Sequence, residues 1–394
     1  MSVHYRKIGA GACGAIFCQT GTGSGRNSTA VALKLAKDRT NPELWNDFVQ
    51  HRKIFGAFVF LFGPSPYSSR SGSGSGYGSD YDREAATICI PKPLGYITAA
   101  ADDDHAQKFW EVEKGLRKAA EPIISALPTQ VLVSERIRPL PKRTRELLIE
   151  KFCSPARNGR EKALADPANA DCLVRVYLGS ISAKTGASGM FFSLRNLKLH
   201  LNQLVQLGLD VETLARRMGL CLAVMHWGAR VDGRDVEFVL GSSSDERINP
   251  EVRREIEKEE LQEEEEEEEH NVVPTVYRGV DDLVCRQTEM WVLDFNQVRD
   301  ITLDDAGVAL AVEAVKLNDP YFPKPLKESE EERGVWKAFV RGYMENSRAV
   351  LEEKLKDEED KEKREEILEL PRKFISGVTE LERERMFKRE RASV

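Results

Sequence analysis

The amino-acid sequence predicts an α+β protein with a small, β-rich N-terminal lobe and a larger, helical C-terminal lobe. The chain has 394 residues, which is too long for one small core and suits two lobes of ordinary size. Short apolar runs with β-branched residues occupy much of the first third, whereas apolar positions at helical spacing prevail later. Hydrophobic residues account for 41% of the chain, which is enough to fill a core in each lobe.

The composition also predicts where the lobes begin and end. We expect the N-terminal lobe over 1–138, the C-terminal lobe over 139–325 and a charged helical extension over 326–394. The Ser/Gly-rich segment 64–81 predicts a flexible loop within the first lobe. Glutamate dominates an insertion over 241–287, which predicts a disordered, solvated acidic loop within the second lobe.

The elements of the first lobe follow from short sequence patterns. Residues 4–37 predict a strand, a Gly-rich turn and a further strand. Residues 42–60 have the length and composition of one helix that runs into an apolar stretch. The runs 88–97 and 130–137 are short and rich in β-branched residues, so each predicts a strand.

The second lobe has longer helical patterns. Residues 139–170 are basic and helical in composition, and residues 172–178 predict a strand. Apolar residues recur at helical spacing across 193–225, which predicts a long helical region. The apolar runs 238–240 and 290–294 predict two short strands.

The C-terminal extension, from about residue 328, predicts a highly charged helix with one apolar stripe. Trp336, Phe339, Val340 and Tyr343 form this stripe, because their spacing places them on one helical face. We expect that face to pack on the second lobe.

The net charge of −7 is concentrated in one segment. Residues 251–270 hold twelve Glu against three basic residues, a charge of −9, so the remainder of the chain carries +2. A nearly neutral body leaves room for local basic patches.

The cysteines and the apolar runs indicate the compartment. The seven cysteines include no CxxC pair and no cysteine–histidine grouping with zinc spacing, so we expect no metal site and a reducing environment. The N-terminus has no apolar run typical of a secretory signal, and no stretch approaches 18 apolar residues. We therefore expect a cytoplasmic protein without membrane contact.

Two motifs in the first lobe have the order and spacing of a nucleotide-binding hairpin. Residues 8–17 (IGAGACGAIF) fit G-x-G-x-x-G, in which glycines let a turn approach a phosphate closely. Val31–Lys34 (VALK) follows about twenty residues later and resembles the V-A-I-K lysine of protein kinases. The helix that should supply an acidic partner for Lys34 offers both Glu43 and Asp47, and the sequence does not choose between them.

A third motif resembles a kinase catalytic loop, H-R-D-x-K-x-x-N followed by a short apolar strand. With Asp232 aligned to the catalytic Asp, Arg234 takes the place of the Lys and Glu237 that of the metal-binding Asn. The segment 291–296 (WVLDFN) resembles the D-F-G segment. Asp294 there takes the place of the metal-ligand Asp.

The order of these motifs predicts a degenerate protein-kinase-like fold, but several departures weaken the prediction of phosphoryl transfer. Arg230-Val231 replaces His-Arg, Glu237 replaces the Asn, and Asn296 replaces the Gly of D-F-G. No A-P-E segment follows at a suitable distance. ATP and Mg²⁺ therefore remain only an alternative expectation, and we expect no cofactor.

The fold prediction brings Asp232, Asp235, Glu237 and Asp294 to one site. Carboxylates at close range must bind a cation or retain a proton, because like charges repel. Mg²⁺, an ammonium or a guanidinium would serve, and a planar guanidinium suits paired carboxylates well. Around these carboxylates we expect substrate contacts from Lys34, Glu43, Asp47, Arg234 and Asn296. His226 could also contact a substrate or act as a base, although its place at the end of an apolar helix favours a packed, structural histidine.

Three segments together resemble a fungal family of unknown function, DUF3669. They are MHWGARVDGRDVEFVLG, MWVLDFNQVRD and LNDPYFPKP, and the resemblance runs from the early KIGAGACGAIF to Pro325. The family has carried a zinc-finger label, which the missing zinc spacing does not support here. Its characterised members are arginine-containing cyclodipeptide synthases, which use aminoacyl-tRNAs including Arg-tRNA. The resemblance implies the same activity in secondary metabolism, with Asp232, Asp235 and Glu237 as the acidic motif and Asp294 nearby.

A tRNA substrate predicts basic surface for phosphates. A basic-rich stretch lies between residues 136 and 162, and we expect contacts there from Arg138, Lys142, Arg143 and Arg145. An ordinary amphipathic helix with solvated charges is the other interpretation of this stretch. We expect neither DNA nor a membrane as a partner.

Three functions stay open at this point. The first is the tRNA-dependent synthase, the second a kinase-like phosphotransferase that uses ATP, and the third a pseudokinase-like binding module without chemistry. Lys34, Asp232 and Asp294 favour the second, whereas Glu237 and the D-F-N sequence weaken it. The charged C-terminal helix and the Glu run would suit the third.

Overall fold

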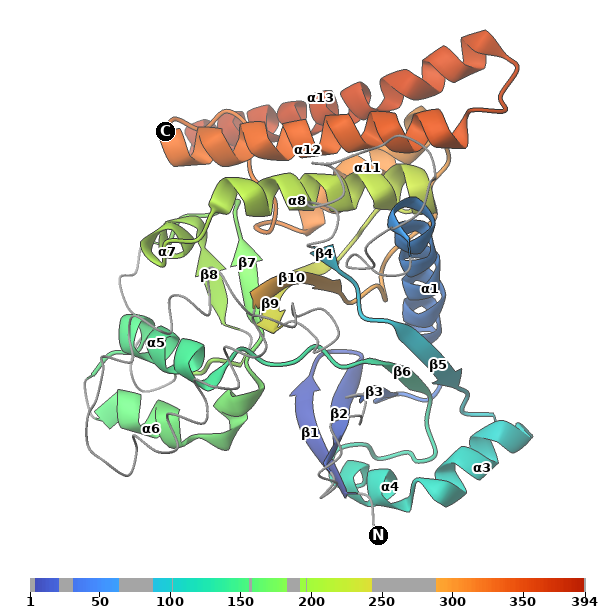
Figure 1. Cartoon of the computed structure of the whole chain (residues 1–394), viewed down its shortest axis with the longest axis vertical. Helices are drawn as coiled ribbons and strands as arrows, with labels where there is room; N and C mark the ends of the chain where they lie inside the picture. Colours follow the sequence, from blue (N-terminus) through green and yellow to red (C-terminus); the bar gives the residue numbers. More distant parts are fainter. Residues whose placement is uncertain are drawn as a thin grey trace, which may run out of the picture.

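The computed structural model of the chain has an α+β architecture, which confirms the predicted fold class at that level. Two five-stranded sheets lie below and beside a layer of long C-terminal helices (Figure 1). The structure describes residues 4–20, 31–63, 88–100, 102–155, 158–182, 192–195, 197–242 and 288–392.

The first sheet is antiparallel throughout, in the order β1-β2-β3-β6-β5. Its strands are β1 (His4–Ala10), β2 (Gly14–Thr20), β3 (Val31–Ala36), β5 (Pro93–Ile97) and β6 (Val131–Glu135). Phe17 and Leu35 are fully buried on one face, where Trp110 of α3 (Asp104–Val112) and Leu116 of α4 (Lys114–Ala120) complete a small core.

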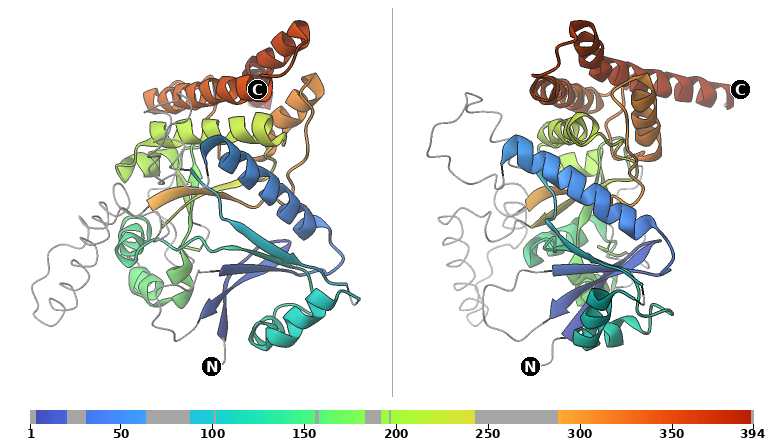
Figure 2. Two further views of the ribbon diagram at one scale, coloured as in Figure 1. Left: turned by 45° about the vertical axis from the view of Figure 1, so that its right-hand side comes forward. Right: turned by 90° about the vertical axis from the view of Figure 1, so that its right-hand side faces the viewer.

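Helix α1 (Glu43–Phe62) connects the two halves of the molecule. It packs on β5 and β6 at one end and on the π-helical turn η3 (Val224–Ala229) further along. Figure 2 shows α1 running obliquely from the first sheet toward the C-terminal helices. Because Glu43 and Asp47 lie in its first turns, both carboxylates are carried to the junction between the sheets.

The second sheet mixes parallel and antiparallel pairs in the order β4-β10-β9-β7-β8. Its strands are β4 (Ile88–Cys89), β7 (Val174–Tyr177), β8 (Lys198–His200), β9 (Glu237–Ser242) and β10 (Thr288–Leu293). The register places Leu293 opposite Glu237, so the residues that follow β10 and those that precede β9 emerge at the same edge.

Helices cover this sheet and build the main hydrophobic core. They are α5 (Lys142–Phe152), α6 (Gly159–Ala165), η2 (Pro167–Asp171), α7 (Leu201–Gln206), α8 (Val211–Ala223), α11 (Asp305–Leu317), α12 (Glu330–Lys354) and α13 (Lys361–Ala392). Helices α8 and α12 cross closely, since a Cβ at Gly219 would meet the Phe339 carbonyl oxygen at 2.3 Å and one at Gly342 the Arg216 oxygen at 2.2 Å.

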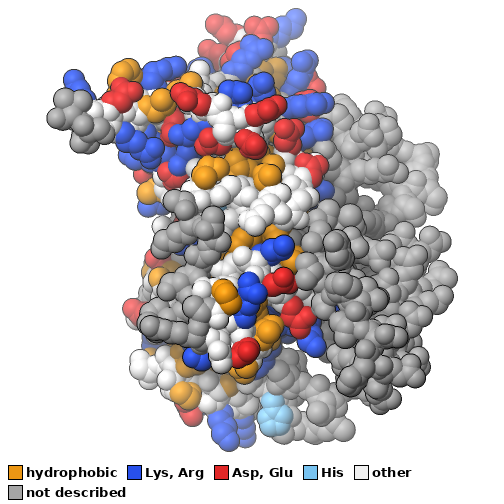
Figure 3. Space-filling view, turned by 90° about the vertical axis from the view of Figure 1, so that its left-hand side faces the viewer, with side chains coloured by type: hydrophobic (Ala, Val, Ile, Leu, Met, Phe, Trp, Pro, Cys, Tyr) orange, Lys and Arg blue, Asp and Glu red, His pale blue; other side chains and the backbone are white. Residues whose placement is uncertain are grey.

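The predicted apolar stripe of the C-terminal helix faces the core as expected. Phe339 and Tyr343 are almost completely buried, and Trp336 and Val340 pack at the margin. Acidic and basic side chains mingle over the exposed faces of α12 and α13 (Figure 3), many in pairs three or four residues apart such as Arg348–Glu352. None of the helices in the described ranges has the combination of length and apolar character that a membrane crossing needs.

Most predicted elements are present, and the differences have local causes. The helical region predicted over 193–225 is interrupted, because β8 precedes α7 and the chain turns at Gly208 (φ +75°) before Asp210 caps α8. Strand β9 runs to Ser242, past the predicted start of the acidic insertion; residues 243–287 and the loop 64–81 lie outside the described residues. Helices α3, α4 and α11 were not predicted.

Candidate functional site

The Lys34 ammonium joins two carboxylates from distant parts of the chain. Its Nζ lies 2.6 Å from Asp47 Oδ2 and 2.8 Å from Asp294 Oδ1. Burial lowers the pKa of Lys34, but the two carboxylates outweigh that effect and raise it. The acidic partner that the sequence left open is therefore Asp47, and α1, β3 and the end of β10 meet at this lysine.

The turn after β10 is held by the first turns of α1. Asp294 has a left-handed backbone (φ +66°), and the N–H of Phe295 donates to Asp47 Oδ1 at 3.2 Å. Asn46 Nδ2 donates to the carbonyl oxygens of Asn296 (2.9 Å) and Val298 (3.0 Å). The D-F-N segment is thus fixed by side chains that precede it by about 250 positions.

Glu237, at the start of β9, has an ion pair and a perturbed pKa. Its Oε1 lies 2.5 Å from Nη2 of Arg175 on β7. The pKa of Glu237 is raised to about 7, because burial and the charges of Asp294 and Asp235 together outweigh the opposing charge of Arg175. A carboxyl that titrates near neutral pH is suited to proton transfer.

Asp235 forms the exposed side of the same cluster. It has a left-handed backbone (φ +61°), and its Oδ2 accepts from Gln297 Nε2 at 2.7 Å. Asn318 accepts its backbone N–H at 2.6 Å and donates to the carbonyl oxygen of Gly233, which fixes the loop before β9. Burial is the main cause that raises the pKa of Asp235, and the negative charge of Asp294 raises it further.

Cys13 lies in the turn between β1 and β2 and reaches this cluster. Its thiol donates to Glu43 Oε2, and Asn296 Nδ2 donates to its Sγ at 3.1 Å. Burial and the neighbouring Glu43 raise the pKa of the thiol to about 11. We define the acidic cluster as Glu43, Asp47, Asp235, Glu237 and Asp294, with Lys34 and Arg175 as the cations in direct contact with it.

Asp232 does not join the acidic cluster. Its side chain is 0% exposed, and its Oδ2 lies 2.6 Å from Nε of Arg299. Its Oδ1 accepts the backbone N–H groups of Arg234 and Arg299, both at 3.0 Å. Of the four carboxylates expected to converge, the structure brings Asp235, Glu237 and Asp294 together, whereas the carboxylate of Asp232 is occupied in a buried ion pair.

His226 and Arg234, two predicted substrate contacts, have no direct contact with the cluster, although the charge of Arg234 opposes the rise in the pKa of Asp235. His226 is fully buried, its Nδ1 lies 2.9 Å from the Tyr343 hydroxyl, and burial lowers its pKa to about 3. This fits the packed histidine favoured by the sequence. The guanidinium of Arg234 instead faces α11, 3.5 Å from Glu313.

The predicted tRNA contacts differ in how much of each side chain is available. Lys142 is exposed at the start of α5. Arg145 donates to the carbonyl oxygen of Leu140 at 3.1 Å and to that of Asn169 at 3.5 Å. Arg143 is partly buried, and Arg138 bridges β9 through its backbone at Ser242.

Sequence reasoning missed four residues of the site. Arg175, Gln297, Asn318 and Cys13 all act through contacts between distant elements, which no local pattern reveals. Only Cys13 carried a signal, since it stands inside the Gly-rich motif.

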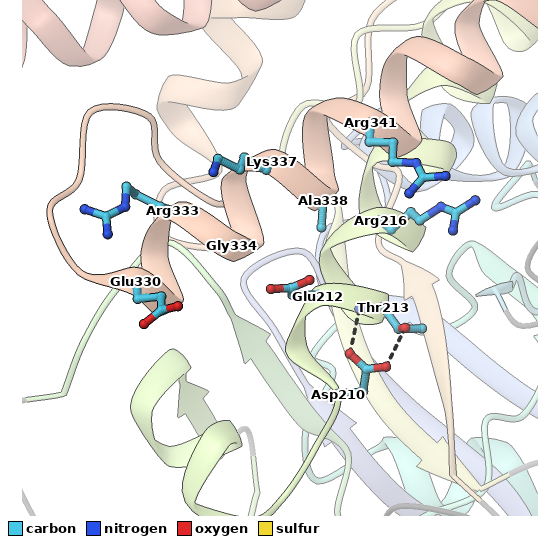
Figure 4. Close-up of a pocket in the computed structure, with 10 residues that line it drawn as sticks. All are labelled: Asp210, Glu212, Thr213, Arg216, Glu330, Arg333, Gly334, Lys337, Ala338 and Arg341. Carbon is cyan, nitrogen blue, oxygen red and sulfur yellow. Dashed lines mark hydrogen bonds between the residues drawn. The ribbon is translucent and has the colours of Figure 1, made fainter.

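A cavity of about 550 Å³ lies between α8 and α12, away from the acidic cluster (Figure 4). Its lining mixes three acidic residues with four basic ones, and Glu212 points into its centre. This cavity and the carboxyl with the pKa near neutral therefore lie in different places. We place the candidate site at the acidic cluster, because it combines unbalanced charge with a carboxyl tuned near neutral pH.

In the part of the chain that the structure describes, no three His, Cys, Asp or Glu side chains are arranged to hold a metal ion.

Residues 290–355 match the sequence model of the family DUF3669, whose description is "Zinc finger protein". The matched stretch includes β10, Asp294, Arg299 and Asn318, and it supports the family assignment made from sequence. This match covers a smaller part of the chain than the resemblance found in the sequence, which runs from the Gly-rich motif to Pro325. No curated protein and no solved structure matches the chain.

Proposed function

We propose that this chain is a tRNA-dependent cyclodipeptide synthase, which joins arginine from Arg-tRNA to a second aminoacyl group as a diketopiperazine. The observation that carries the proposal is the imbalance of charge in the acidic cluster. Five carboxylates meet there, and Lys34 and Arg175 are the cations in direct contact. Such a site requires a further cation or a proton.

A kinase-like, two-lobed fold belongs to the same proposal. It is supported by the antiparallel sheet β1-β2-β3-β6-β5, by the contact of Lys34 with an acidic residue of the following helix, and by the β9–β10 pair that carries Glu237 and Asp294. In this fold the Gly-rich turn and the acidic residues line one substrate site.

An arginyl side chain meets the chemical requirement of the cluster. Asp235 is exposed, and Glu237 and Asp294 are partly exposed, so a guanidinium has access to all three. A planar guanidinium forms two parallel charge-assisted hydrogen bonds to a carboxylate, which an ammonium does not. Within the chain itself, Glu237 pairs with the Arg175 guanidinium and Asp232 with that of Arg299, each through one nitrogen–oxygen contact.

Glu237 is the proposed general base. Its carboxylate takes a proton from the α-ammonium of one aminoacyl group, and the amine then attacks the ester carbonyl carbon of the other. The ester C–O bond breaks and the tRNA ribose oxygen is released as a hydroxyl. A second attack by the remaining amine closes the ring and frees the second tRNA, so the enzyme consumes no ATP.

The remaining expectations follow from this reaction. Arg138, Lys142, Arg143 and Arg145 are proposed to contact tRNA phosphates, with Lys142 the most available of them. A role in cytoplasmic secondary metabolism, without DNA or membrane partners, is part of the proposal.

The test is mass spectrometry of extracts from a host that expresses the chain. We expect a new arginine-containing diketopiperazine from the wild type and none from the double variant Asp235→Ala, Glu237→Ala. The matched control is Asp357→Ala, Glu359→Ala, which removes the same two residue types from the exposed connection between α12 and α13. Absence of the product from well-expressed, soluble wild-type protein would refute the proposal.

One observation favours a second candidate, an ATP-dependent phosphotransferase. Lys34 contacts both an acidic residue of α1 and Asp294, as a phosphate-binding lysine beside a metal-binding aspartate would. That function predicts saturable binding of ATP·Mg²⁺ which is lost in Lys34→Met. The synthase predicts that product formation does not depend on ATP. A binding module would retain its partner after every one of these substitutions.

A further inference from the structure

Cys13 differs from the other cysteines in its surroundings. Of the six cysteines in the described ranges, five are buried and Cys13 alone is partly exposed. Cys89 also contacts a carboxylate, that of Glu289, but both side chains are buried in the second sheet. Of these two thiols that contact a carboxylate, Cys13 is the one that a substrate can reach.

The turn that carries Cys13 is held in a defined position. Lys37 donates from its backbone N–H to the Cys13 carbonyl oxygen at 3.1 Å and from its Nζ to that of Gly11 at 2.6 Å. A Cβ at Gly14 would lie 2.8 Å from the Leu35 carbonyl oxygen, so glycine permits the close approach of the turn to β3. This approach brings the thiol to Glu43 and Asn296.

Asn296 provides an independent sign of a ligand. The residue is 5% exposed, and its Oδ1 has no hydrogen-bond partner among the residues that the structure describes, whereas its Nδ2 donates to Cys13 Sγ. A buried acceptor without a partner costs about 1–3 kcal/mol. A donor on a substrate bound at the thiol, such as an α-ammonium, would satisfy it.

We propose that Cys13 is the acyl acceptor of the synthase, with Glu43 as its base and Asn296 as a positioning residue. The inference rests on the proposed function and adds a covalent intermediate to it. The charges of Asp294 and Lys34 act on the Cys13 thiol, which therefore borders the acidic cluster. An acyl group on Cys13 would extend its side chain beside these carboxylates, so the proposal assigns the arginyl group to Cys13 and has arginine loaded first.

The first half-reaction exchanges an ester for a thioester. Cys13 Sγ attacks the carbonyl carbon of Arg-tRNA while Glu43 takes the thiol proton. The C–O bond to the ribose breaks, and the ribose oxygen takes the proton from Glu43. The products are an arginyl thioester on Cys13 and a free tRNA hydroxyl, without oxidation or reduction.

The second half-reaction restores the thiol. The α-amine of the second aminoacyl-tRNA, freed of its proton by Glu237, attacks the thioester carbonyl carbon. The C–S bond breaks, Sγ takes up a proton, and the dipeptide remains on the second tRNA. The arginyl amine then attacks that ester and closes the ring. Because the thiol is protonated at neutral pH, the first step depends on Glu43.

The experiment uses the full purified chain and Arg-tRNA alone, with rapid acid quench and intact-protein mass spectrometry. We expect one arginyl group on the wild type, removable by hydroxylamine, and none on Cys13→Ala. Product formation from both aminoacyl-tRNAs should fall at least about 100-fold in Cys13→Ala. Cys13→Ser, which keeps the volume, should retain slow acylation as an oxygen ester and shows that loss in Cys13→Ala is chemical.

The variant Glu43→Gln distinguishes a role of Glu43 as the base from a purely structural role. Its acylation rate should rise about tenfold per pH unit between pH 6 and 8, because only the thiolate then reacts, whereas the wild-type rate changes less. Asn296→Ala should slow acylation by Arg-tRNA, whereas binding of uncharged tRNA, which carries no α-ammonium, should stay unchanged.

The outcomes distinguish the two proposals. If the wild type makes the diketopiperazine and Cys13→Ala makes as much, the covalent step is refuted and the synthase stands. If the wild type makes none, the proposed function fails and the covalent step fails with it.

Discussion

The loop before β9 carries carboxylates in two very different situations only a few residues apart. Asp232 is buried, and its two oxygens are satisfied by the Arg299 guanidinium and by two backbone N–H groups. Asp235 and Glu237 face an acidic cluster whose cations are fewer than its carboxylates. The same short segment therefore holds one carboxylate for structure and two for binding or chemistry.

The comparison shows what an arginine ligand would supply. At Asp232 the protein provides its own guanidinium, and the pair joins the loop before β9 to the turn after β10. At the acidic cluster the Arg175 guanidinium pairs with Glu237, but within the described ranges Asp235 accepts only from the neutral Gln297 amide and has no ion pair. A substrate guanidinium there would form an ion pair with Asp235, as Arg299 does with Asp232.

The largest expected effect is on the structural side of the comparison. Asp232→Ala should lower the free energy of unfolding by about 3 kcal/mol, because it leaves the Arg299 guanidinium and two backbone N–H groups without their acceptor. Urea denaturation followed by fluorescence measures it. Asp235→Ala, at the exposed end of the same loop, should change that free energy by less than about 0.5 kcal/mol. Equal losses of unfolding free energy in the two variants would contradict the distinction between Asp232 and Asp235.

Ligand binding tests the acidic cluster, the second member of the comparison. Free L-arginine at ten times its dissociation constant should stabilise the wild type by about 1.4 kcal/mol, and thermal unfolding reports this as a higher melting temperature. Asp235→Asn should lose the shift, because a neutral amide no longer attracts the guanidinium. L-lysine, with the same charge but no planar fork, should give a smaller shift. An equal rise in melting temperature with Asp235→Asn would show that arginine binds elsewhere.

Glu237 should make stability depend on pH. Its folded pKa, about 7, is raised above its ordinary value, so the protonated form favours folding and this contribution is lost as pH rises from about 4.5 through 7. Glu237→Gln cannot ionise, so its free energy of unfolding should exceed that of the wild type at pH 8 and show no such gain at pH 4. Parallel stability curves for the two proteins between pH 4 and 8 would contradict the shifted pKa.

The smallest effect is expected at Arg234. Its guanidinium meets Glu313 at the surface at 3.5 Å, and its structural contact with Asp232 uses the backbone N–H, which any residue retains. Arg234→Ala should therefore stay within about 0.5 kcal/mol of the wild type and form product at the same rate. A large loss of activity would return Arg234 to the substrate contacts predicted from sequence.

Local sequence patterns predicted the parts of the site that depend on spacing. The Gly-rich turn after β1, the strand that carries Lys34 and the apolar strand at Glu237 are where these patterns predicted them. Residues 4–37 form three strands, β1, β2 and β3, and not the two that were predicted. Glu43 and Asp47 lie one helical turn apart on the same face, so spacing could not decide which of them contacts Lys34.

Contacts across long separations were beyond such patterns. A one-dimensional alignment to a kinase loop gave Asp232 a place beside Asp235, but only folding brings Arg299 onto Asp232. No local pattern distinguishes Cys13 from the other cysteines as a thiol with partners, because its neighbours Glu43 and Asn296 come from α1 and the turn after β10. The domain boundaries and the roles of the site residues stay predictions.

The most direct test of the central claim uses purified protein, preformed Arg-tRNA and a second aminoacyl-tRNA, without ATP. The account predicts an arginine-containing diketopiperazine whose rate of formation rises with pH around a midpoint near 7, as Glu237 loses its proton, and a loss of that midpoint in Glu237→Gln. No product from this mixture, or a rate in Glu237→Gln equal to that of the wild type at every pH, would contradict the acidic cluster as the site of the reaction.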